Sequence, residues 1–272
     1  MMRALYTGAT GMLAQQANVD NISNNLANVN TVGYKQEKTE FKSLLYQTVQ
    51  TRTTSANGEQ KPISAQVGLG TRVASNTSIY TQGALQASEN GTDFAIVGDG
   101  FFAVRGSDGE TYYTRAGNFT WAIGANGAIT LCNTDGYPVL DTAGNPIVLP
   151  AGVSASSVIV TSDGGFGYIN ANGAYVNMNQ RFGLHQFNNA AGLEKVGDNL
   201  LAVTEASGPA LNEANNANLT ASQIRQNYLE ASNVQVANEM VNLIIAQRAY
   251  QLNSKAITAS DDMLEQANNL KR

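Results

Sequence analysis

The chain has 272 residues, 43% of them hydrophobic, which is enough to bury a core and long enough for more than one domain. Only 14% of the residues are charged, the net charge is -5, and no run interleaves basic with aromatic residues, so we expect no nucleic-acid partner. One cysteine and one histidine exclude an internal disulfide and metal clusters built on these residue types. We therefore expect no metal and no cofactor.

The N-terminal stretch MMRALYTGATGMLAQQANVD lacks the apolar run and the cleavage site of a secretory signal. No other run approaches the roughly 18 uninterrupted apolar residues of a membrane helix. These features alone predict a cytoplasmic protein. A Ser-His or Cys-His catalytic system would depend on His185 alone, and the adjacent Asp261 and Asp262 are typical of a solvated helix face, so we expect no enzyme.

The first predicted element is a long helix within residues 1–34. Its hydrophobic residues recur at the heptad spacing of a helix that packs on another helix. This part of the predicted seam consists of Leu5, Met12, Val19 and Leu26. Gly33 stands where a left-handed residue would end the helix.

Asparagine is unusually frequent late in this helix, in the stretch NISNNLANVN from residue 21. It is a poor helix former because its amide competes for backbone hydrogen bonds, so another role must select it. Helical spacing places four of these residues on one amide face, namely Asn21, Asn24, Asn25 and Asn28. Uncharged amides both donate and accept, so such a face can pack against copies of itself. We predict polymer contacts here and on a partly similar face of the last helix formed by Asn227, Gln235, Asn238 and Asn242, and a merely solvated helix face is the alternative.

Residues 35–75 are rich in Thr, Ser and Gln and are interrupted by Asn-Gly, Pro and Gly-x-Gly, which predicts an extended connector of short strands. The glycines of GLG lack the following helix that a phosphate-binding loop requires, so we interpret them as turns. The candidate residues of a rod-specific segment here are Gln47, Thr48, Pro62, Gly68 and Gly70.

Residues 76–221 are predicted to form an all-β domain that ends in a return connector. Runs such as DFAIV, FFAVR and NPIVLP are typical of strands, and Asx-Gly pairs between such runs supply the positive φ angles of type I′ hairpin turns. The pairs are Asn90-Gly91, Asp99-Gly100, Asp108-Gly109, Asn126-Gly127, Asp135-Gly136, Asp163-Gly164 and Asn172-Gly173.

After Pro209 the chain has neither Gly nor Pro, and we predict a helix from about Ser222 to Leu270, within a terminal region of residues 222–272. Heptad spacing continues the predicted seam through Leu229, Val236, Leu243, Tyr250, Ile257 and Leu264. Two long helices with narrow apolar stripes most simply pack on each other. The predicted fold class is α+β, in which long N- and C-terminal helices form a coiled-coil layer with an inserted all-β domain and an extended connector.

Three stretches resemble a known family. ISNNLANVNTVGYK, followed by FKSLLYQTV, is similar to the N-terminal signature of the bacterial flagellar rod and hook axial proteins. GTDFAIVGDGFFAV resembles their central motif, and YLEASNVQVANEMVNLIIAQRAYQLNSKAITASDDML resembles their C-terminal helix. The length, the Thr/Gln-rich segment after LLYQT and the pairing of YLEASNV with AQRAY make the resemblance nearest to members that form the distal rod.

The resemblance implies a non-enzymatic building block that polymerises helically into a hollow drive shaft, transmits torque from motor to hook and passes exported subunits. Terminal helices would line the tube and the β domain would face outward. The implied partners are further copies of the chain, proximal rod proteins, hook protein, the P and L ring proteins and the flagellar type III export apparatus. The implied location is a basal body that spans the periplasm and outer envelope, reached without a cleaved signal peptide, and it replaces the cytoplasmic expectation.

The implied polymer leads to two further expectations. The terminal helices of a free monomer lack partners and are expected to be disordered before assembly. The segment from Gln47 to Thr71 is expected to brace a straight rod. The alternatives that stay open are a proximal rod or hook protein of the same family and, remotely, a secreted β-rich carbohydrate-active protein, which would need an acid pair or a binding groove.

Overall fold

The computed structural model describes residues 2–50, 65–124, 127–150, 152–170, 173–216 and 218–270. The chain divides into two compact units. The terminal unit consists of Met1–Ala27, Glu37–Thr77 and Gln235–Arg272. The β-rich unit consists of Asn28–Gln36 and Ser78–Val234.

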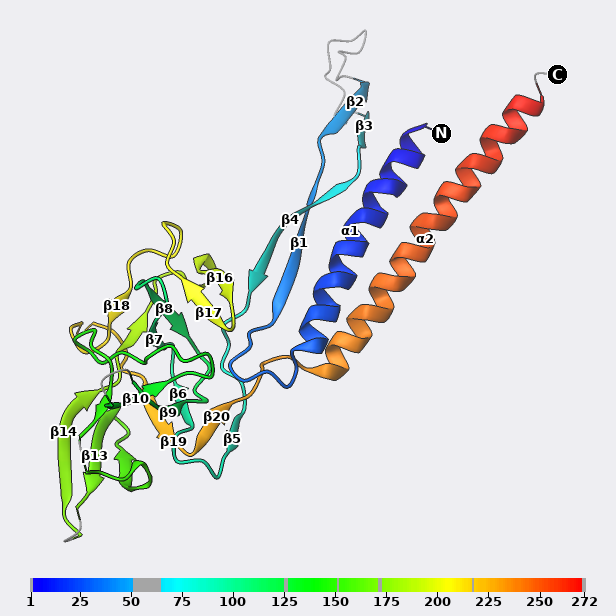
Figure 1. The fold of residues 1–272 in the computed structure, drawn as a ribbon. Coiled ribbons are helices and arrows are strands. Elements are labelled where there is room, and N and C mark those ends of the chain that lie inside the picture. The colour runs from blue at the N-terminus through cyan, green and yellow to red at the C-terminus, as the bar shows by residue number, and fades with distance from the viewer. Residues whose placement is uncertain are drawn as a thin grey trace. The chain divides into compact units, whose positions relative to one another are not determined.

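The described residues form long helices at both ends of the chain and short strands between them (Figure 1). The α-helices are α1 (Met2–Ala27) and α2 (Val236–Asn269), and the short 3-10 helices are η1 (Ala155–Ser157) and η2 (Ala190–Gly192). The strands are β1 (Glu37–Ser43), β2 (Tyr46–Gln50), β3 (Ala65–Gly68), β4 (Thr71–Ser78), β5 (Leu85–Ala87), β6 (Phe94–Val97), β7 (Phe101–Arg105), β8 (Thr111–Thr114), β9 (Thr120–Ile123), β10 (Ile129–Cys132), β11 (Val148–Leu149), β12 (Val158–Val160), β13 (Gly165–Ile169), β14 (Tyr175–Arg181), β15 (Leu184–Gln186), β16 (Glu194–Gly197), β17 (Leu200–Ala202), β18 (Leu211–Asn212), β19 (Gln223–Gln226) and β20 (Tyr228–Glu230). The α+β prediction is therefore confirmed.

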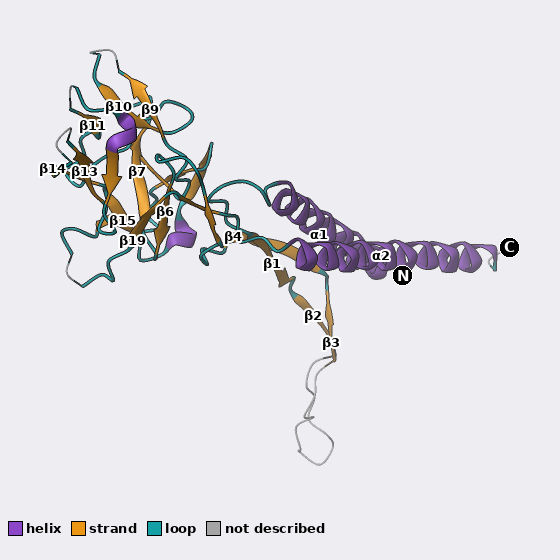
Figure 2. Cartoon of the chain, turned by 90° about the horizontal axis from the view of Figure 1, so that it is seen from below, coloured by secondary structure: helices purple, strands orange, loops and turns teal. Residues whose placement is uncertain are grey.

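In the terminal unit α1 and α2 pack side by side and run antiparallel, as Figures 1 and 2 show. Glycines let the helices approach closely at one end of the pair. A Cβ atom on Gly8 would lie 2.9 Å from Cγ1 of Ile257, and one on Gly11 would lie 2.8 Å from Nδ2 of Asn253. Larger residues at these two positions would push the helices apart.

The C-terminal helix is shorter than predicted, because it begins at Val236 and not near Ser222. Residues 223–226 instead form β19, which pairs with β6, and residues 228–230 form β20, which pairs with β5. Ile224 of β19 is buried in the core of the β-rich unit. The missing glycines and prolines allowed a helix here, but pairing with distant strands decided the structure.

Gly33 is left-handed as predicted, with φ 70°, but it does not cap α1, which ends at Ala27. A Cβ atom on Gly33 would meet the backbone of Arg115 and Ala116, and its N–H donates to the carbonyl oxygen of Glu230 at 2.9 Å. The glycine therefore permits a close approach of three chain segments within the β-rich unit.

The predicted connector forms a two-stranded ribbon, in which β1 pairs with β4 and β2 pairs with β3. It belongs to the terminal unit, where β1 packs against α1. Gly70 lies against Thr10 of α1, so a side chain at this position would collide with the helix. An isolated two-stranded ribbon is marginally stable in water, and this contact with α1 supports it.

In the β-rich unit the largest sheet has the strand order β16-β17-β8-β7-β15-β18. Smaller sheets place β10 between β9 and β11, and β13 between β12 and β14. The core between them is centred on buried aromatic rings, with ring centroids 5.0 Å apart for Phe94 and Phe182 and 5.1 Å apart for Phe102 and Phe119. The run FFAVR is continuously apolar because β7 is a central strand buried on both faces.

The hairpin turns differ from the predicted type. At Asp108-Gly109, Asp135-Gly136 and Asp163-Gly164 only the glycine has positive φ, and its N–H donates to the carbonyl three residues earlier. This is a type I turn followed by a left-handed glycine, so the type I′ prediction is wrong at these pairs. Both residues of Asp198-Asn199, between β16 and β17, have positive φ instead. Asn126 and Asn172 lie outside the described residues.

Candidate self-assembly surfaces

The residues of the predicted seam are only partly covered within the chain. Leu5, Met12, Val19 and Leu26 are all half-buried on α1. On α2, Leu243, Ile257 and Leu264 are half-buried, whereas Val236 and Tyr250 are exposed. Leu229 is wrongly placed by the prediction, because it lies in β20 of the β-rich unit and pairs with Gln86 of β5.

The buried positions of α2 are small or polar, and the sequence reasoning missed them. They are Glu239, Ala246 and Ser260. Together with Asn253, which faces Gly11, they repeat at heptad spacing and alternate with the predicted seam residues by three and four positions. The contact between α1 and α2 is thus close and partly polar, and much of the apolar surface of α2 is left uncovered within the described chain.

Two members of the amide face are used inside the chain. Asn21 is 7% exposed and donates to Oγ1 of Thr39 at 2.8 Å. Asn25 is 1% exposed, donates to the carbonyl of Glu37 at 2.8 Å, accepts from the N–H of Glu37 at 2.9 Å and donates to Oε2 of Glu239 at 3.3 Å. These amides join α1 to β1, and Asn25 also joins it to α2, so their described partners lie inside the chain and the polymer contact predicted for them stays a prediction without support from this geometry.

The other members of the amide face are accessible. Asn24 is exposed and Asn28, just beyond the end of α1, is half-buried. Asn238 and Asn242 are exposed on α2, and they donate to Gln235 at 2.6 Å and to Glu239 at 3.5 Å, respectively. Their side chains remain candidates for contact with another molecule.

Large apolar side chains are exposed along α2 beyond the heptad positions of the predicted seam. Val241, Ile244, Ile245 and Leu252 are between 55% and 66% exposed. Ala246 and Asn253 lie on the side of α2 that faces α1, and Ile245 and Leu252 directly precede them. Because successive residues of an α-helix are rotated by about 100°, Ile245 and Leu252 point away from α1. They form the exposed stripe of α2.

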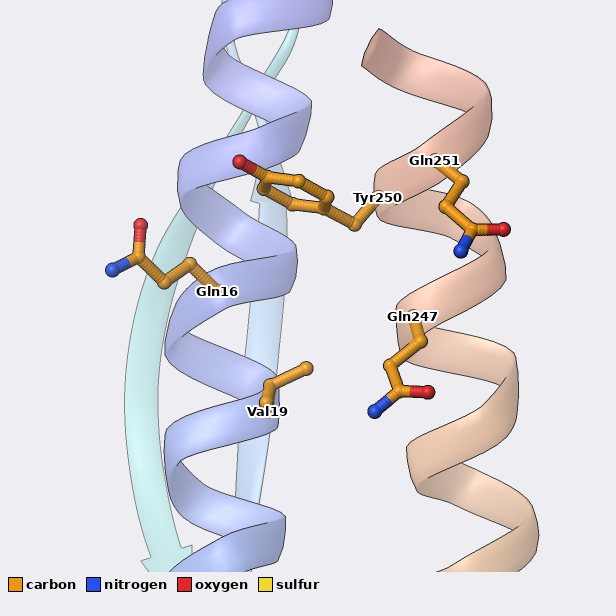
Figure 3. Close-up of a pocket in the computed structure, with 5 residues that line it drawn as sticks. All are labelled: Gln16, Val19, Gln247, Tyr250 and Gln251. Carbon is orange, nitrogen blue, oxygen red and sulfur yellow. The ribbon is translucent and has the colours of Figure 1, made fainter. Parts of the chain in front are cut away.

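A groove of about 380 Å³ lies between α1 and α2, as Figure 3 shows. Gln16 and Val19 line it from α1, and Gln247, Tyr250 and Gln251 line it from α2. Tyr250 reaches from α2 toward α1. Amides beside one aromatic ring suit contact with another polypeptide surface better than they suit catalysis, since none of these side chains is an acid or base near neutral pH.

The ribbon carries the candidate residues of the rod-specific segment. Gln47 and Thr48 lie in β2, Gly68 lies in β3, Gly70 follows it, and Pro62 lies outside the described residues. Several large apolar residues are exposed on the ribbon, namely Phe41, Leu45, Tyr46, Val49, Val67 and Val73. The ribbon therefore offers a second apolar surface.

A cavity of about 230 Å³ in the β-rich unit is lined by two acidic residues, Asp163 and Glu213. Both carboxylate oxygens of Glu213 are occupied, because they accept from Oγ and N–H of Ser222 at 2.8 and 2.7 Å and from Nε2 of Gln186 at 2.9 Å. In the described part of the chain no three metal-ligating side chains gather, and neither helix is long and apolar enough to cross a membrane.

Comparisons with known families match three parts of the chain. Residues 5–35 match the flagella basal body rod protein family, residues 95–168 match the flagellar hook protein FlgE/F/G D1 domain, and residues 225–270 match the flagellar basal body rod FlgEFG protein C-terminal region. These matches include α1, the centre of the β-rich unit and α2.

Relatives match over the full length. The chain is 42% identical to the flagellar basal-body rod protein FlgG of Borreliella burgdorferi, covering 100% of both chains, and 38% identical to FlgG of Bacillus subtilis with the same coverage. It is 32% identical to the flagellar hook-basal body complex protein FlhP of Bacillus subtilis, again over 100% of both chains. The solved hook protein FlgE2 of Helicobacter pylori shares 16% sequence identity over 65% of this chain and 48% of its own. The TM-score is 0.24, which is too low to indicate a shared fold.

The chain belongs to the flagellar basal-body rod FlgEFG family, whose members are structural and non-enzymatic. Within this family it is a structural subunit of the distal rod, like the FlgG proteins that match it from end to end. It is located in the basal-body rod and assembles with rod and hook components.

Proposed function

We propose that the chain polymerises helically with further copies of itself, through its terminal unit, into a hollow shaft that transmits torque and lets exported subunits pass. The proposal rests on the exposed stripe of α2. Four large apolar side chains at more than half exposure are costly in water, and burial gains about 25 cal/mol for each Å² of apolar surface removed from it. A second copy that covers the stripe would supply this burial.

The accessible part of the predicted interface supports the same assignment. The groove beside Tyr250, the amides of Asn24, Asn238 and Asn242, and the apolar residues of the ribbon would add contacts without bringing like charges together. Many modest contacts in series would make the shaft stiff. The segment from Gln47 to Thr71 would brace it.

Substitutions in the stripe test the interface. Ile245→Asp and Leu252→Asp, expressed in a strain that lacks the gene, are expected to give basal bodies without the distal rod under the electron microscope. Ile123→Asp is the matched control, because Ile123 is 79% exposed in the β-rich unit and the chemical change is the same. Normal rods with the stripe variants, or equal loss with the control, would contradict the proposed interface.

The uncomplemented strain tests the position of the subunit in the axis. We expect rods that stop before the rings and the hook. Complete rods that lack only a hook would assign the chain to the hook, and intact flagella would overturn the function.

The partners and the route are also proposed from the family resemblance. The shaft would join proximal rod proteins to hook protein, pass through the P and L rings across the periplasm and outer envelope, and receive its subunits from the type III export apparatus without a cleaved signal peptide. The terminal helices of the free monomer are expected to be disordered. Circular dichroism that shows α1 and α2 in full in a dilute monomer would contradict this expectation.

A further inference from the structure

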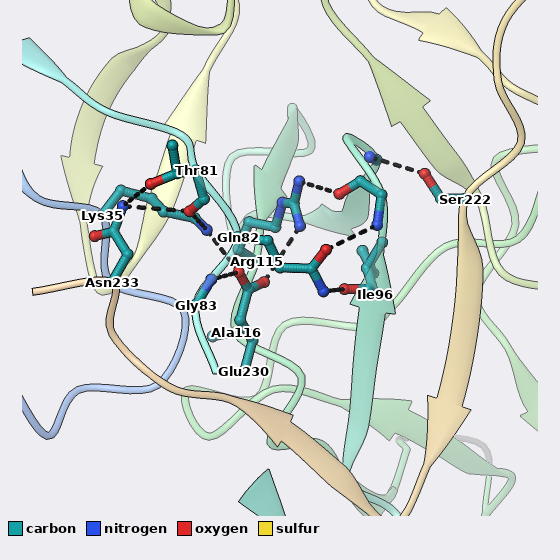
Figure 4. A network of polar contacts seen from close by, with 12 residues as sticks. Lys35, Thr81, Gln82, Gly83, Ile96, Arg115, Ala116, Ser222, Glu230 and Asn233 are labelled. Carbon is teal, nitrogen blue, oxygen red and sulfur yellow. Dashed lines mark hydrogen bonds and ion pairs between the residues drawn. The ribbon is translucent and has the colours of Figure 1, made fainter. Parts of the chain in front are cut away.

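Three charged side chains from distant parts of the sequence are buried together in the β-rich unit, as Figure 4 shows. Lys35 ends the stretch VGYK, Arg115 ends TYYTR and Glu230 lies in YLEASNV. Their exposed fractions are 5%, 4% and 1%. The proposed assembly surfaces do not use them, so their burial needs another explanation.

Glu230 is the centre of this cluster. Its Oε1 lies 2.6 Å from Nζ of Lys35 and its Oε2 lies 3.2 Å from Nη1 of Arg115. Oε1 also accepts from the N–H of Gly83 at 2.9 Å, and the backbone carbonyl of Glu230 accepts from the N–H of Gly33. One residue thereby contacts three separate segments of the chain.

The two cations are held from their other sides. Nζ of Lys35 donates to the carbonyl of Thr81 at 2.8 Å, and Nη2 of Arg115 donates to the carbonyl of Gly98 at 2.6 Å. The guanidinium of Arg115 lies 5.0 Å from the centroid of the Phe101 ring. Arg115 thus ties the cluster to the strands of the core.

Asn233 joins the same segments a second time. Its Oδ1 accepts from the N–H of Gln36 at 2.7 Å, and its Nδ2 donates to the carbonyl of Ile79 at 2.8 Å and to Oγ1 of Thr81 at 2.9 Å. The N–H of Ile79 donates to the carbonyl of Gln36 at 2.8 Å. The segments 33–36, 79–83 and 230–233 are therefore bonded to one another in every pairing.

These segments are the ones that continue into the terminal unit. The chain crosses between the units at four points, namely directly after Ala27, directly after Gln36, directly before Ser78 and directly after Val234, and the first two crossings bound the segment 28–36. A force that enters the β-rich unit at Gln36, Ser78 or Val234 reaches these bonded residues within a few positions.

We propose that Glu230, with Lys35, Arg115 and Asn233, forms a clamp that makes the three segments open together and not one at a time. The clamp is a conformational device, and it would distribute a load that arrives along one of the three segments over all of them. It does not depend on polymerisation, so its failure in a test would leave the proposed assembly surfaces untouched.

The charges of the clamp predict an order of effects. Two cations share one carboxylate, so we expect the cluster to tolerate the loss of a cation better than the loss of its anion. Burial lowers the pKa of Lys35, and the charge of Glu230 opposes this shift. Removing the charge of Glu230 leaves two buried cations side by side, whereas removing Lys35 leaves a balanced pair of Arg115 and Glu230.

Amide hydrogen exchange on the full chain tests the clamp. The reporters are the hydrogen-bonded amides of Gly33, Ile79 and Ala231, one from each segment, and those of Leu131 and Val139 report the core. We expect Glu230→Gln to speed exchange at all three segment reporters at least tenfold with little change in the core, and Lys35→Met to do so by a smaller factor. Glu213→Gln is the matched control, because Glu213 is also a hydrogen-bonded carboxylate of this unit but lies outside the clamp.

Faster exchange only at Ala231, an equal rise in the core, or a larger effect of Lys35→Met than of Glu230→Gln would overturn the proposal. If Glu230→Gln does not fold, Lys35→Met still decides it. That variant must speed exchange in all three segments together, and a change confined to Gly33 would reject the clamp.

Discussion

At the scale of single residues, Asn21 and Asn25 of α1 use their amides for hydrogen bonds inside the chain. Asn25 pairs with both backbone groups of Glu37 and also reaches the carboxylate of Glu239. Only a neutral amide can donate to a carbonyl and a carboxylate while it accepts from an N–H. The amide of Asn25 thus fixes the positions of β1 and of the start of α2 against α1. The cost is a residue with lower helix propensity within α1.

The Asn25→Asp variant is expected to destabilise the terminal unit by about 2–3 kcal/mol, because aspartate loses the donor and places a second negative charge beside Glu239. The change in stability is measured from the urea concentration at which assembled rods lose their helical circular dichroism signal. Asn76→Asp is the control, since Asn76 is exposed in β4 of the same unit, and its effect should stay within about 0.5 kcal/mol. Equal effects of the two variants would contradict the internal role.

His185 gives the β-rich unit a pH dependence. Burial lowers the pKa of His185 from its usual 6.5, and the carbonyl of Gly183 and the charge of Glu213 oppose this only in part. As the pH falls below about 6.5, His185 of the unfolded chain takes up a proton at a higher pH than His185 of the folded chain does. The free energy of unfolding therefore decreases as the pH is lowered. Glutamine at this position cannot titrate and should remove that part of the loss.

Thermal unfolding followed by the fluorescence of Trp121, the single tryptophan, measures this in the β-rich unit. Between pH 7.5 and 5.5 the Tm of the unchanged protein should fall further than that of His185→Gln. Parallel curves would show that His185 contributes nothing.

At the scale of elements, the pairing of α1 with α2 depends on small residues. The heptad pattern correctly indicates two helices that pack together, but it assigns the contact only to the large apolar residues. The structure places Gly8, Gly11, Ala246 and Ser260 at or near the contact instead. Small residues bring the backbones close, and the large residues are then free to face elsewhere.

The Gly8→Val variant is expected to weaken the helix pair by about 1–3 kcal/mol, since a Cβ atom there would lie 2.9 Å from Cγ1 of Ile257. Ile257→Ala in the same chain should restore part of the loss because it frees the space. The urea dependence of the helical signal in assembled rods compares the two. If the loss of stability in the double variant equals the sum of the losses in the two single variants, the contact between position 8 and Ile257 is not the cause.

Element boundaries were less predictable than element types. The strands around DFAIV and FFAVR were correctly located, because continuous or alternating apolar runs report burial directly. Residues 222–235 were not, because their strand character comes from pairing with β6 and β5, far earlier in the sequence. Asp198-Asn199 escaped detection as a turn because it lacks the glycine that usually marks such a turn.

At the scale of the whole molecule, the connector belongs to the terminal unit and not to a separate linker. β2 and β3 pair on either side of residues 51–64, which lie outside the described residues, so the segment from Gln47 to Thr71 includes β3, Gly70 and all of β2 except Tyr46. A ribbon fixed to α1 is suited to brace neighbouring subunits, which is the role proposed for it.

Deleting Gln47–Thr71 is expected to leave export intact and to give bent or hook-like rods, because the contacts that oppose bending would be lost. Electron microscopy of purified basal bodies measures rod curvature, and export is checked in the culture medium. A Gly/Ser segment of equal length is the control, and it should bend the rods as the deletion does. Straight rods after the deletion would reject the bracing role.

The sequence by itself determined the fold class, the two terminal helices, most core strands and the family, because apolar periodicity, turn residues and long motifs are local properties of the chain. The tertiary structure alone decided which asparagines face inward, where α2 begins, and that Lys35, Arg115 and Glu230 meet. These outcomes depend on contacts between residues as far as 214 positions apart, and no local pattern specifies the partner of a buried charge or amide.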